Sequence, residues 1–163
     1  MDNNKTIEQI ASTHLGQSGS YAVYTTEVDP TLLVALPRQL ARQEAGINMS
    51  TTNMSGVDVW HCHEMTCLLN SGLPIAGTLK IVYPSSSKYM VESKSLKLYT
   101  NTFDQAKMGE TIEEAIQSME LQVKQDLSLL LETHDVQVTF HRTLENLKSL
   151  PFIDYDDLYE LLS

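Results

Sequence analysis

The chain has 163 residues, of which 42% are hydrophobic and 20% charged, a balance that is ordinary for one soluble globular domain. Its 21 acidic and 11 basic residues leave a formal net charge of −10, opposite to the usual balance of proteins that bind nucleic acid directly. No apolar run reaches the roughly 18 residues that span a membrane, and residues 1–5 lack the features of a secretory signal. We therefore expect a cytoplasmic protein with reduced thiols that binds neither nucleic acid nor membrane.

The first third of the chain predicts little regular structure. A short amphipathic stretch over 7–15 predicts a helix that ends at Gly16. The following segment, 16–56, is rich in Gly, Ser, Thr and Asn and predicts extended connections. Positive charge is concentrated at Pro37–Arg42, and its simplest interpretation is a solvated loop. We expect residues 1–56 to be an N-terminal extension with loops.

A β-hairpin is predicted next. The run 57–69 contains Val, Trp, His, Met and Thr with no breaker, and 70–74 is a turn cluster. Residues 75–83 alternate between two sets of side chains and predict a second strand, which 84–88 ends. Cys62 and Cys67 differ in strand parity, so we expect them on opposite sides and without a disulfide bridge.

Two helices and a third strand complete the predicted core. A first helix is expected to continue to about Lys107. Thr111 and Glu114 have the spacing of a capping box before nearly 20 residues of helical periodicity. Residues 136–141 alternate as a strand. The order β-β-α-α-β predicts one α+β domain with its core over 57–142 and a tail over 143–163.

The tail combines acidic and apolar residues. Asp154 has the residue type and position to cap a short final helix whose first turn is acidic. Two interpretations stay open: a helix that docks on the domain, and an acidic motif that binds a partner.

The octapeptide Glu92–Tyr99 is the most informative segment. On a helix, Leu96, Tyr99 and Phe103 form one apolar stripe. Lys94 and Lys97 then lie away from that stripe, on a face that suits either solvent or an anion.

The octapeptide resembles the signature of the NADPH-dependent 7-cyano-7-deazaguanine reductases, the nitrile reductases of queuosine biosynthesis: Glu-Ser-Lys-(Ser/Ala)-x-Lys-(Leu/Tyr)-(Tyr/Phe/Trp). The resemblance extends over about 15–142, and specifically to the N-terminal module of the long, two-module form. It implies an antiparallel sheet with two helices on one face, the tunnelling fold (T-fold), and assembly into oligomers. The other matching segments are Leu15–Ser18, Asp29–Leu33, Pro37–Arg42, Asp58–Trp60, Glu64, Gly72–Pro74 and the run from Glu92 to Phe103.

The resemblance also implies roles for the signature residues. It assigns Glu92 and Ser93 to the deazapurine substrate, since a carboxylate accepts hydrogen bonds from purine-type N–H donors. It assigns Lys94, Ser95 and Lys97 to NADPH, whose phosphates need cations and hydrogen-bond donors. No G-x-G-x-x-G turn is present, so the sequence offers no Rossmann site.

The catalytic strings of this family are missing. Its nitrile reduction begins with a cysteine thiolate that adds to the nitrile carbon, and two hydrides from NADPH then supply the four electrons. The thiol belongs to Cys-Pro/Leu-x-Thr-x-Gln-Pro-Asp, and Phe-His-Glu follows. This chain has neither string: residues 67–75 contain no Gln-Pro-Asp, and 103–105 read Phe-Asp-Gln. In the long reductases these strings lie in the C-terminal module.

Two weaker site hypotheses come from the first predicted strand. Cys67 lies roughly where a nucleophile would lie in a one-module enzyme, and the alternative interpretation is an inert structural thiol. His61, His63 and Cys67 share strand parity and so suit a zinc ion, against the simpler interpretation of half-buried polar side chains.

Three functions follow from these residues. The first is a reductase subunit that binds the substrate and NADPH, completed by a second, thiol-bearing T-fold chain. The second is a non-catalytic module that binds a deazapurine or regulates a reductase by mixed assembly. The third is a diverged stand-alone enzyme that uses Cys67.

Overall fold

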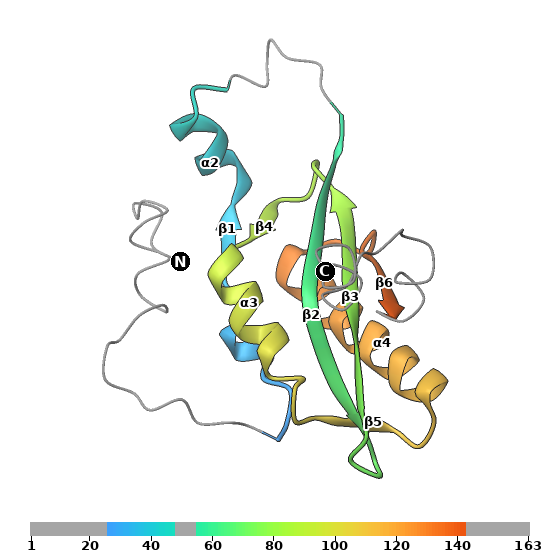
Figure 1. The fold of residues 1–163 in the computed structure, drawn as a ribbon. Helices are drawn as coiled ribbons and strands as arrows, with labels where there is room; N and C mark the ends of the chain where they lie inside the picture. Colours follow the sequence, from blue (N-terminus) through green and yellow to red (C-terminus); the bar gives the residue numbers. More distant parts are fainter. Residues whose placement is uncertain (1–25, 48–54, 143–163) are drawn as a thin grey trace, which may run out of the picture.

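The computed structural model describes residues 26–47 and 55–142 (Figure 1). The sequence segments 7–15 and 143–163, for which helices are expected, lie outside these ranges. The elements follow in the order η1 (Pro30–Leu32), β1 (Ala35–Pro37), α2 (Arg38–Glu44), β2 (Val57–Leu69), β3 (Pro74–Pro84), β4 (Tyr89–Val91), α3 (Ser93–Asn101), β5 (Lys107–Gly109), α4 (Ile112–Leu131) and β6 (Gln137–Arg142).

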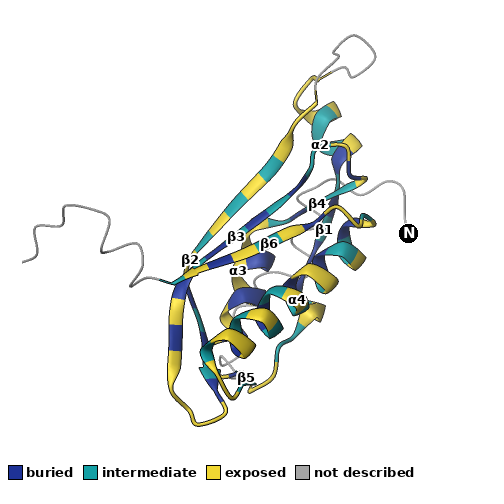
Figure 2. Ribbon diagram, turned by 90° about the vertical axis from the view of Figure 1, so that its right-hand side faces the viewer, coloured by how far each residue is buried: buried dark blue, intermediate teal, exposed yellow. Residues whose placement is uncertain are grey.

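A four-stranded sheet with the order β5-β2-β3-β6 forms the body of the domain. β2 and β3 form the predicted antiparallel hairpin, β6 pairs antiparallel with β3, and the short β5 pairs parallel with β2. Helices α3 and α4 lie on one side of this sheet, as Figure 2 shows for α4 along its length. The α+β class is confirmed. The predicted β-β-α-α-β order is incomplete, because the short strand β4 precedes α3 and the short strand β5 lies between α3 and α4.

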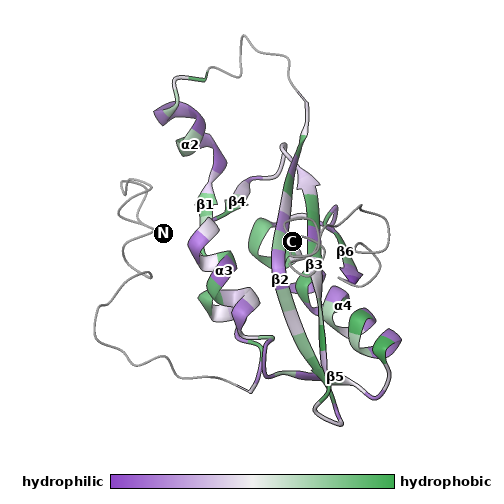
Figure 3. Ribbon diagram, viewed as in Figure 1, coloured by the Kyte–Doolittle hydropathy of each residue, from purple (hydrophilic) through white to green (hydrophobic). Residues whose placement is uncertain are grey.

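The core lies between the sheet and the two helices. Alternate residues of β3 point inward, and Leu79 and Ile81 are fully buried. Helix α4 begins at the predicted capping box of Thr111 and Glu114, and hydrophobic and hydrophilic residues alternate along it (Figure 3). Its buried stripe consists of Ala115, Met119, Val123, Leu127 and Leu131.

The prediction of little regular structure over 16–56 is wrong for its described part. Residues 38–44 form α2, and β1 pairs with β4 in a separate two-stranded sheet. Pro37–Arg42 is therefore not a solvated loop, and Arg38 is only 7% exposed. The residues of α2 are good helix formers. The pairing of β1 with β4 anchors the start of this helix, and composition alone does not predict that pairing.

The first helix is also shorter than expected, because α3 ends at Asn101 and Lys107 lies in β5. The Thr102 hydroxyl donates a hydrogen bond to the Tyr99 carbonyl at 2.6 Å, and the Phe103 amide turns back to the Thr100 carbonyl. These bonds satisfy the last carbonyls of the helix and replace its next turn.

A β-bulge changes the side of the sheet to which β2 residues point. Cys62 pairs with Leu79 and Met65 with Gly77, so three steps along β2 match two along β3. The extra residue lies at Glu64, whose φ of 63° is unusual for a residue other than glycine. Strand parity therefore holds only up to the bulge and is reversed after it.

Candidate functional site

The signature octapeptide begins at a capped helix end. Glu92 is the N-cap of α3, and its Oε2 accepts a hydrogen bond from the Ser95 amide at 2.7 Å. The other carboxylate oxygen accepts no hydrogen bond from the described residues. One oxygen is thus held by the helix while the other can accept a hydrogen bond from a ligand.

Ser95 joins this helix end to the segment before β1. Its side chain is fully buried, donates to the Glu92 carbonyl at 2.7 Å and accepts from the Val34 amide at 3.1 Å. The Glu92 amide in turn donates to the Val34 carbonyl at 2.9 Å. The hydroxyl expected to meet NADPH is therefore engaged in the fold, and in this structure it acts by fixing the start of α3.

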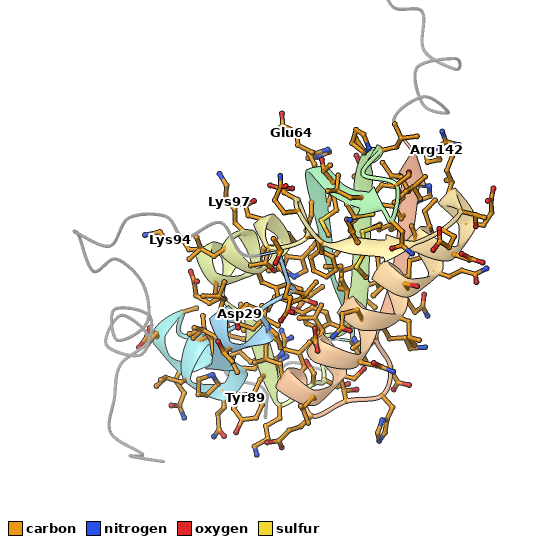
Figure 4. The ribbon with its side chains drawn as sticks, turned by 90° about the horizontal axis from the view of Figure 1, so that it is seen from below. Asp29, Glu64, Tyr89, Lys94, Lys97 and Arg142 are labelled. Atoms are coloured by element: carbon orange, nitrogen blue, oxygen red, sulfur yellow. The ribbon has the colours of Figure 1, made fainter. Side chains whose placement is uncertain are left out.

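The outer side of α3 presents two cations. Ser93, Lys94 and Lys97 are exposed, and Figure 4 shows both lysines extending away from the helix. Neither lysine belongs to the ion pairs found within 26–47 and 55–142. Leu98 is 45% exposed beside them, so this face combines positive charge with an apolar patch. Such a face suits a ligand that carries both phosphate and a ring.

The inner side of α3 carries the predicted apolar stripe. Leu96, Tyr99 and Phe103 are at most 2% exposed, which confirms the stripe. The Tyr99 hydroxyl donates to Asp126 of α4 at 2.6 Å, and both carboxylate oxygens of Asp126 also accept from Gln122 at 3.0 Å. Burial, with the Asp126 hydrogen bond and charge, raises the pKa of Tyr99 well above its usual range. α4 thus holds the signature helix through a neutral phenol.

An arginine clamp positions the strand that leads into the signature. Arg38 forms a forked contact with Asp58 of β2, at 2.5 and 3.4 Å, and its Nε donates to the Ser87 carbonyl at 3.0 Å. Its Nη2 also lies within hydrogen-bond distance of the Ser87 hydroxyl and the Tyr89 carbonyl. The clamp fixes the start of β4, three residues before Glu92.

The thiols and histidines of β2 do not form a shared site. Beyond the bulge Cys67 lies in the core and is 0% exposed, whereas His61 and His63 are exposed on the opposite face. The expected parity of these three residues is wrong, and so is the expected separation of Cys62 from Cys67, since Cys62 also packs against the core. Within the described ranges, no group of three His, Cys, Asp or Glu side chains is placed to hold a metal ion.

Burial makes both thiols poor nucleophiles. Desolvation raises the pKa of Cys62 and that of Cys67 to about 11. Both thiols are free, and desolvation by burial is the cause of the raised pKa of Cys67. The environment of Cys67 therefore keeps this candidate nucleophile protonated.

Comparison with known proteins gives a consistent match. The family model described as nitrile reductase, 7-cyano-7-deazaguanine-reductase N-term matches residues 24–140. The chain belongs to this family. It is 38% identical over 110 residues to the NADPH-dependent 7-cyano-7-deazaguanine reductase of Rickettsia canadensis, and 37% identical over 110 residues to that of Rickettsia felis. The corresponding reductase of Ralstonia nicotianae is 38% identical over 111 residues.

These matches cover 68% of this chain but only 38% of each of those three relatives. The matched part contains the α3 signature, and it lies in the N-terminal part of the family. No helix in the described ranges combines the length and apolar character needed to cross a membrane.

Sequence reasoning missed three contacts that shape the site. The Arg38–Asp58 pair joins residues 20 positions apart, the Tyr99–Asp126 bond joins residues 27 apart, and the bond between Val34 and Ser95 spans 61. A partial signal existed for Arg38, because Pro37–Arg42 and Asp58–Trp60 are both segments of the family resemblance. Asp126 had no such signal.

Proposed function

We propose that this chain is a subunit of a 7-cyano-7-deazaguanine reductase of queuosine biosynthesis, which binds NADPH and the deazapurine at α3 while a second chain supplies the reactive thiol. The observation that carries the proposal is the way α3 presents the signature residues. The Ser95 amide orients the Glu92 carboxylate, and Lys94 and Lys97 extend from the exposed side of the helix.

The exposed residues fit a phosphate-bearing dinucleotide. Lys94 and Lys97 supply positive charge one helical turn apart. NADPH, when bound, would supply hydride to the nitrile. Ser95 is proposed to act indirectly, by holding Glu92 and Val34 in place rather than by touching the cofactor.

The substrate role falls to Glu92, with Ser93 beside it. Glu92 offers its second carboxylate oxygen to the N–H donors of a deazapurine, and its first oxygen is already positioned by the helix. A carboxylate fixed before the ligand arrives loses less side-chain entropy on binding.

The need for a second chain is inferred from the thiols. Nucleophilic addition requires a thiolate, and both described cysteines lie in the core with raised pKa values. The strings that carry the thiol, the aspartate and the His-Glu pair in the family are missing from this sequence. A thiol-bearing T-fold chain would supply them in a mixed oligomer.

The buried thiols equally favour a second function, a module that binds the deazapurine or regulates a reductase without reacting. An anaerobic assay of NADPH absorbance with 7-cyano-7-deazaguanine separates the possibilities. We expect consumption when this chain is mixed with a partner that carries Cys-x-x-Thr-x-Gln-Pro-Asp and Phe-His-Glu, and none with either chain alone. Deazapurine binding without consumption in the mixture would support the binding module. Consumption by this chain alone would support the stand-alone enzyme through Cys67.

The cofactor site has its own test. Lys94→Ala with Lys97→Ala should weaken NADPH binding about 10- to 100-fold, since each lysine loses a charge-assisted contact worth about 1 kcal/mol at an exposed site. Lys107→Ala with Lys124→Ala is the matched control, because both of these exposed lysines lie outside the signature and the net charge changes equally. Equal affinities of the two double variants in a fluorescence titration would remove Lys94 and Lys97 from the site.

A further inference from the structure

A buried tyrosine of the four-stranded sheet contacts the strand that leads into the signature. Tyr83 of β3 is 1% exposed. Its hydroxyl oxygen lies 3.1 Å from Nε1 of Trp60 on β2 and 3.3 Å from the amide nitrogen of Val91 on β4. Side chains of two strands and the backbone of a third therefore meet at one oxygen atom. We call this group of three residues the Tyr83 junction.

Both groups that point at the Tyr83 oxygen can only donate hydrogen bonds. An indole N–H and a backbone N–H accept nothing, whereas a phenol oxygen has two lone pairs and can accept from both. Burial is the largest influence on the pKa of Tyr83 and raises it, so the phenol stays neutral at physiological pH. A phenyl ring at this position would fill nearly the same space and leave two donors unpaired in the core. The hydroxyl group is therefore required by its two partners rather than by the packing of the ring.

The sheet register places the two aromatic side chains side by side. Trp60 pairs with Ile81, and Tyr83 lies two residues further along β3. The two rings are therefore diagonal neighbours, and both pack on the helix side of the sheet. Trp60 is half-buried, so its indole has few rotamers available. The indole N–H then holds the phenol oxygen in one position toward β4.

The Tyr83 junction holds the backbone immediately before Glu92, the N-cap of α3. Val91 donates its amide hydrogen to Tyr83, and the next amide, that of Glu92, donates to the Val34 carbonyl at 2.9 Å. These consecutive amides are thus held by the four-stranded sheet and by the segment before β1, respectively. Figure 1 shows β4 between the end of β3 and the start of α3. Loss of the junction would release the backbone of β4 from the four-stranded sheet one residue before the carboxylate.

We propose that Trp60 and Tyr83 are positioning residues of the deazapurine site, because they hold the backbone from which the Glu92 carboxylate extends. This inference rests on the proposed function, in which Glu92 accepts hydrogen bonds from the N–H donors of the base. Such bonds depend strongly on distance and angle, so a small displacement of Glu92 weakens them. NADPH, in contrast, meets long and flexible lysine side chains, which can follow its phosphates when the start of the helix shifts. The Tyr83 junction therefore sets the affinity for the base and leaves the affinity for NADPH nearly unchanged.

Calorimetric titration of the full chain with 7-cyano-7-deazaguanine and, separately, with NADPH tests this difference. Tyr83→Phe should weaken base binding about 10-fold and Trp60→Phe about threefold, with NADPH affinity within about twofold of wild type, since one misplaced hydrogen bond has an effect of this order. Tyr89→Phe is the matched control, because it removes a phenol hydroxyl of β4 that lies outside the junction, and both affinities should stay unchanged. Unchanged base affinity in Tyr83→Phe, or an equal loss for both ligands, would refute the positioning role.

Amide hydrogen exchange of the full chain gives a readout that needs no ligand. Tyr83→Phe should accelerate exchange at Val91 and Glu92 about 10-fold more than at Leu127, a buried residue of α4, because the lost acceptor frees the backbone locally. Tyr89→Phe should produce no such difference. If the wild-type chain binds neither ligand, the proposed function fails, whereas local acceleration at Val91 and Glu92 still supports the hold of the junction on this backbone. Equal acceleration at Leu127 would show a global loss of stability only, and it would refute the inference, as would unchanged exchange at Val91 and Glu92.

Discussion

Arg38→Met is expected to destabilise the domain strongly, because it removes every donor of the clamp while keeping much of the side-chain volume. The Arg38 side chain is 9% exposed and that of Asp58 26% exposed. The substitution leaves the Asp58 carboxylate without its cation and the Ser87 carbonyl without its Nε donor. Removing one partner of a buried ion pair is costly because the remaining charge stays desolvated.

The expected magnitude follows from this exposure. Breaking a fully buried pair costs about 3–5 kcal/mol, and the partial exposure of Asp58 lets water recover some of its hydration. We therefore expect a loss of about 3 kcal/mol, a substantial part of the roughly 5–15 kcal/mol that stabilises an ordinary domain. With an m-value of about 1.5 kcal/mol/M, the urea midpoint should fall by about 2 M.

Urea unfolding at one fixed protein concentration, followed by far-UV circular dichroism, measures this change. A double-mutant cycle with Asp58→Asn isolates the pair, and Asp58→Asn should cost less than 1 kcal/mol when Arg38 is already Met. A loss below 1 kcal/mol for Arg38→Met, or additive effects of the two substitutions, would refute the clamp and restore the solvated interpretation of Pro37–Arg42.

Three further outcomes are expected. Tyr99→Phe removes the 2.6 Å bond to Asp126 and should lower the melting temperature by about 5 °C, for a loss of about 1–2 kcal/mol; an unchanged melting temperature would show that the hydroxyl does not hold α3 to α4. Cys62 and Cys67 should react slowly with a disulfide reagent at pH 8 and rapidly in urea. Because their folded pKa of about 11 exceeds the unfolded value of about 9, the folded thiols hold more protons and stability should decline as pH rises from 9 to 11; rapid labelling of the folded chain at pH 8 would contradict this. The chain should form oligomers because β6 is an edge strand and the short β5 pairs with only the end of β2, at Leu68 and Leu69; a light-scattering mass of about 18 kDa at micromolar concentration would argue against it.

Local patterns in the sequence were sufficient to predict the main strands and helices of the core. The hairpin of 57–69 and 75–83 was predictable because breakers bound both runs, and β2 and β3 match these limits to within one residue. The capping box at Thr111 likewise specified the start of α4, since both of its hydrogen bonds form within four residues. The octapeptide Glu92–Tyr99 is sufficient to indicate the family, and the apolar stripe of its helix is buried as expected.

Tertiary structure decided which side chains meet. Strand parity is a local property, yet the extra residue at Glu64 depends on how β2 pairs with β3, and it reverses the placement of every later residue of β2. That single insertion separates Cys67 from His61 and His63. Ser95 shows the same limit, because whether a hydroxyl meets a ligand or the Val34 amide depends on a segment 61 residues away. Periodicity and capping describe neighbours along the chain, whereas burial and pairing arise only when distant segments pack together.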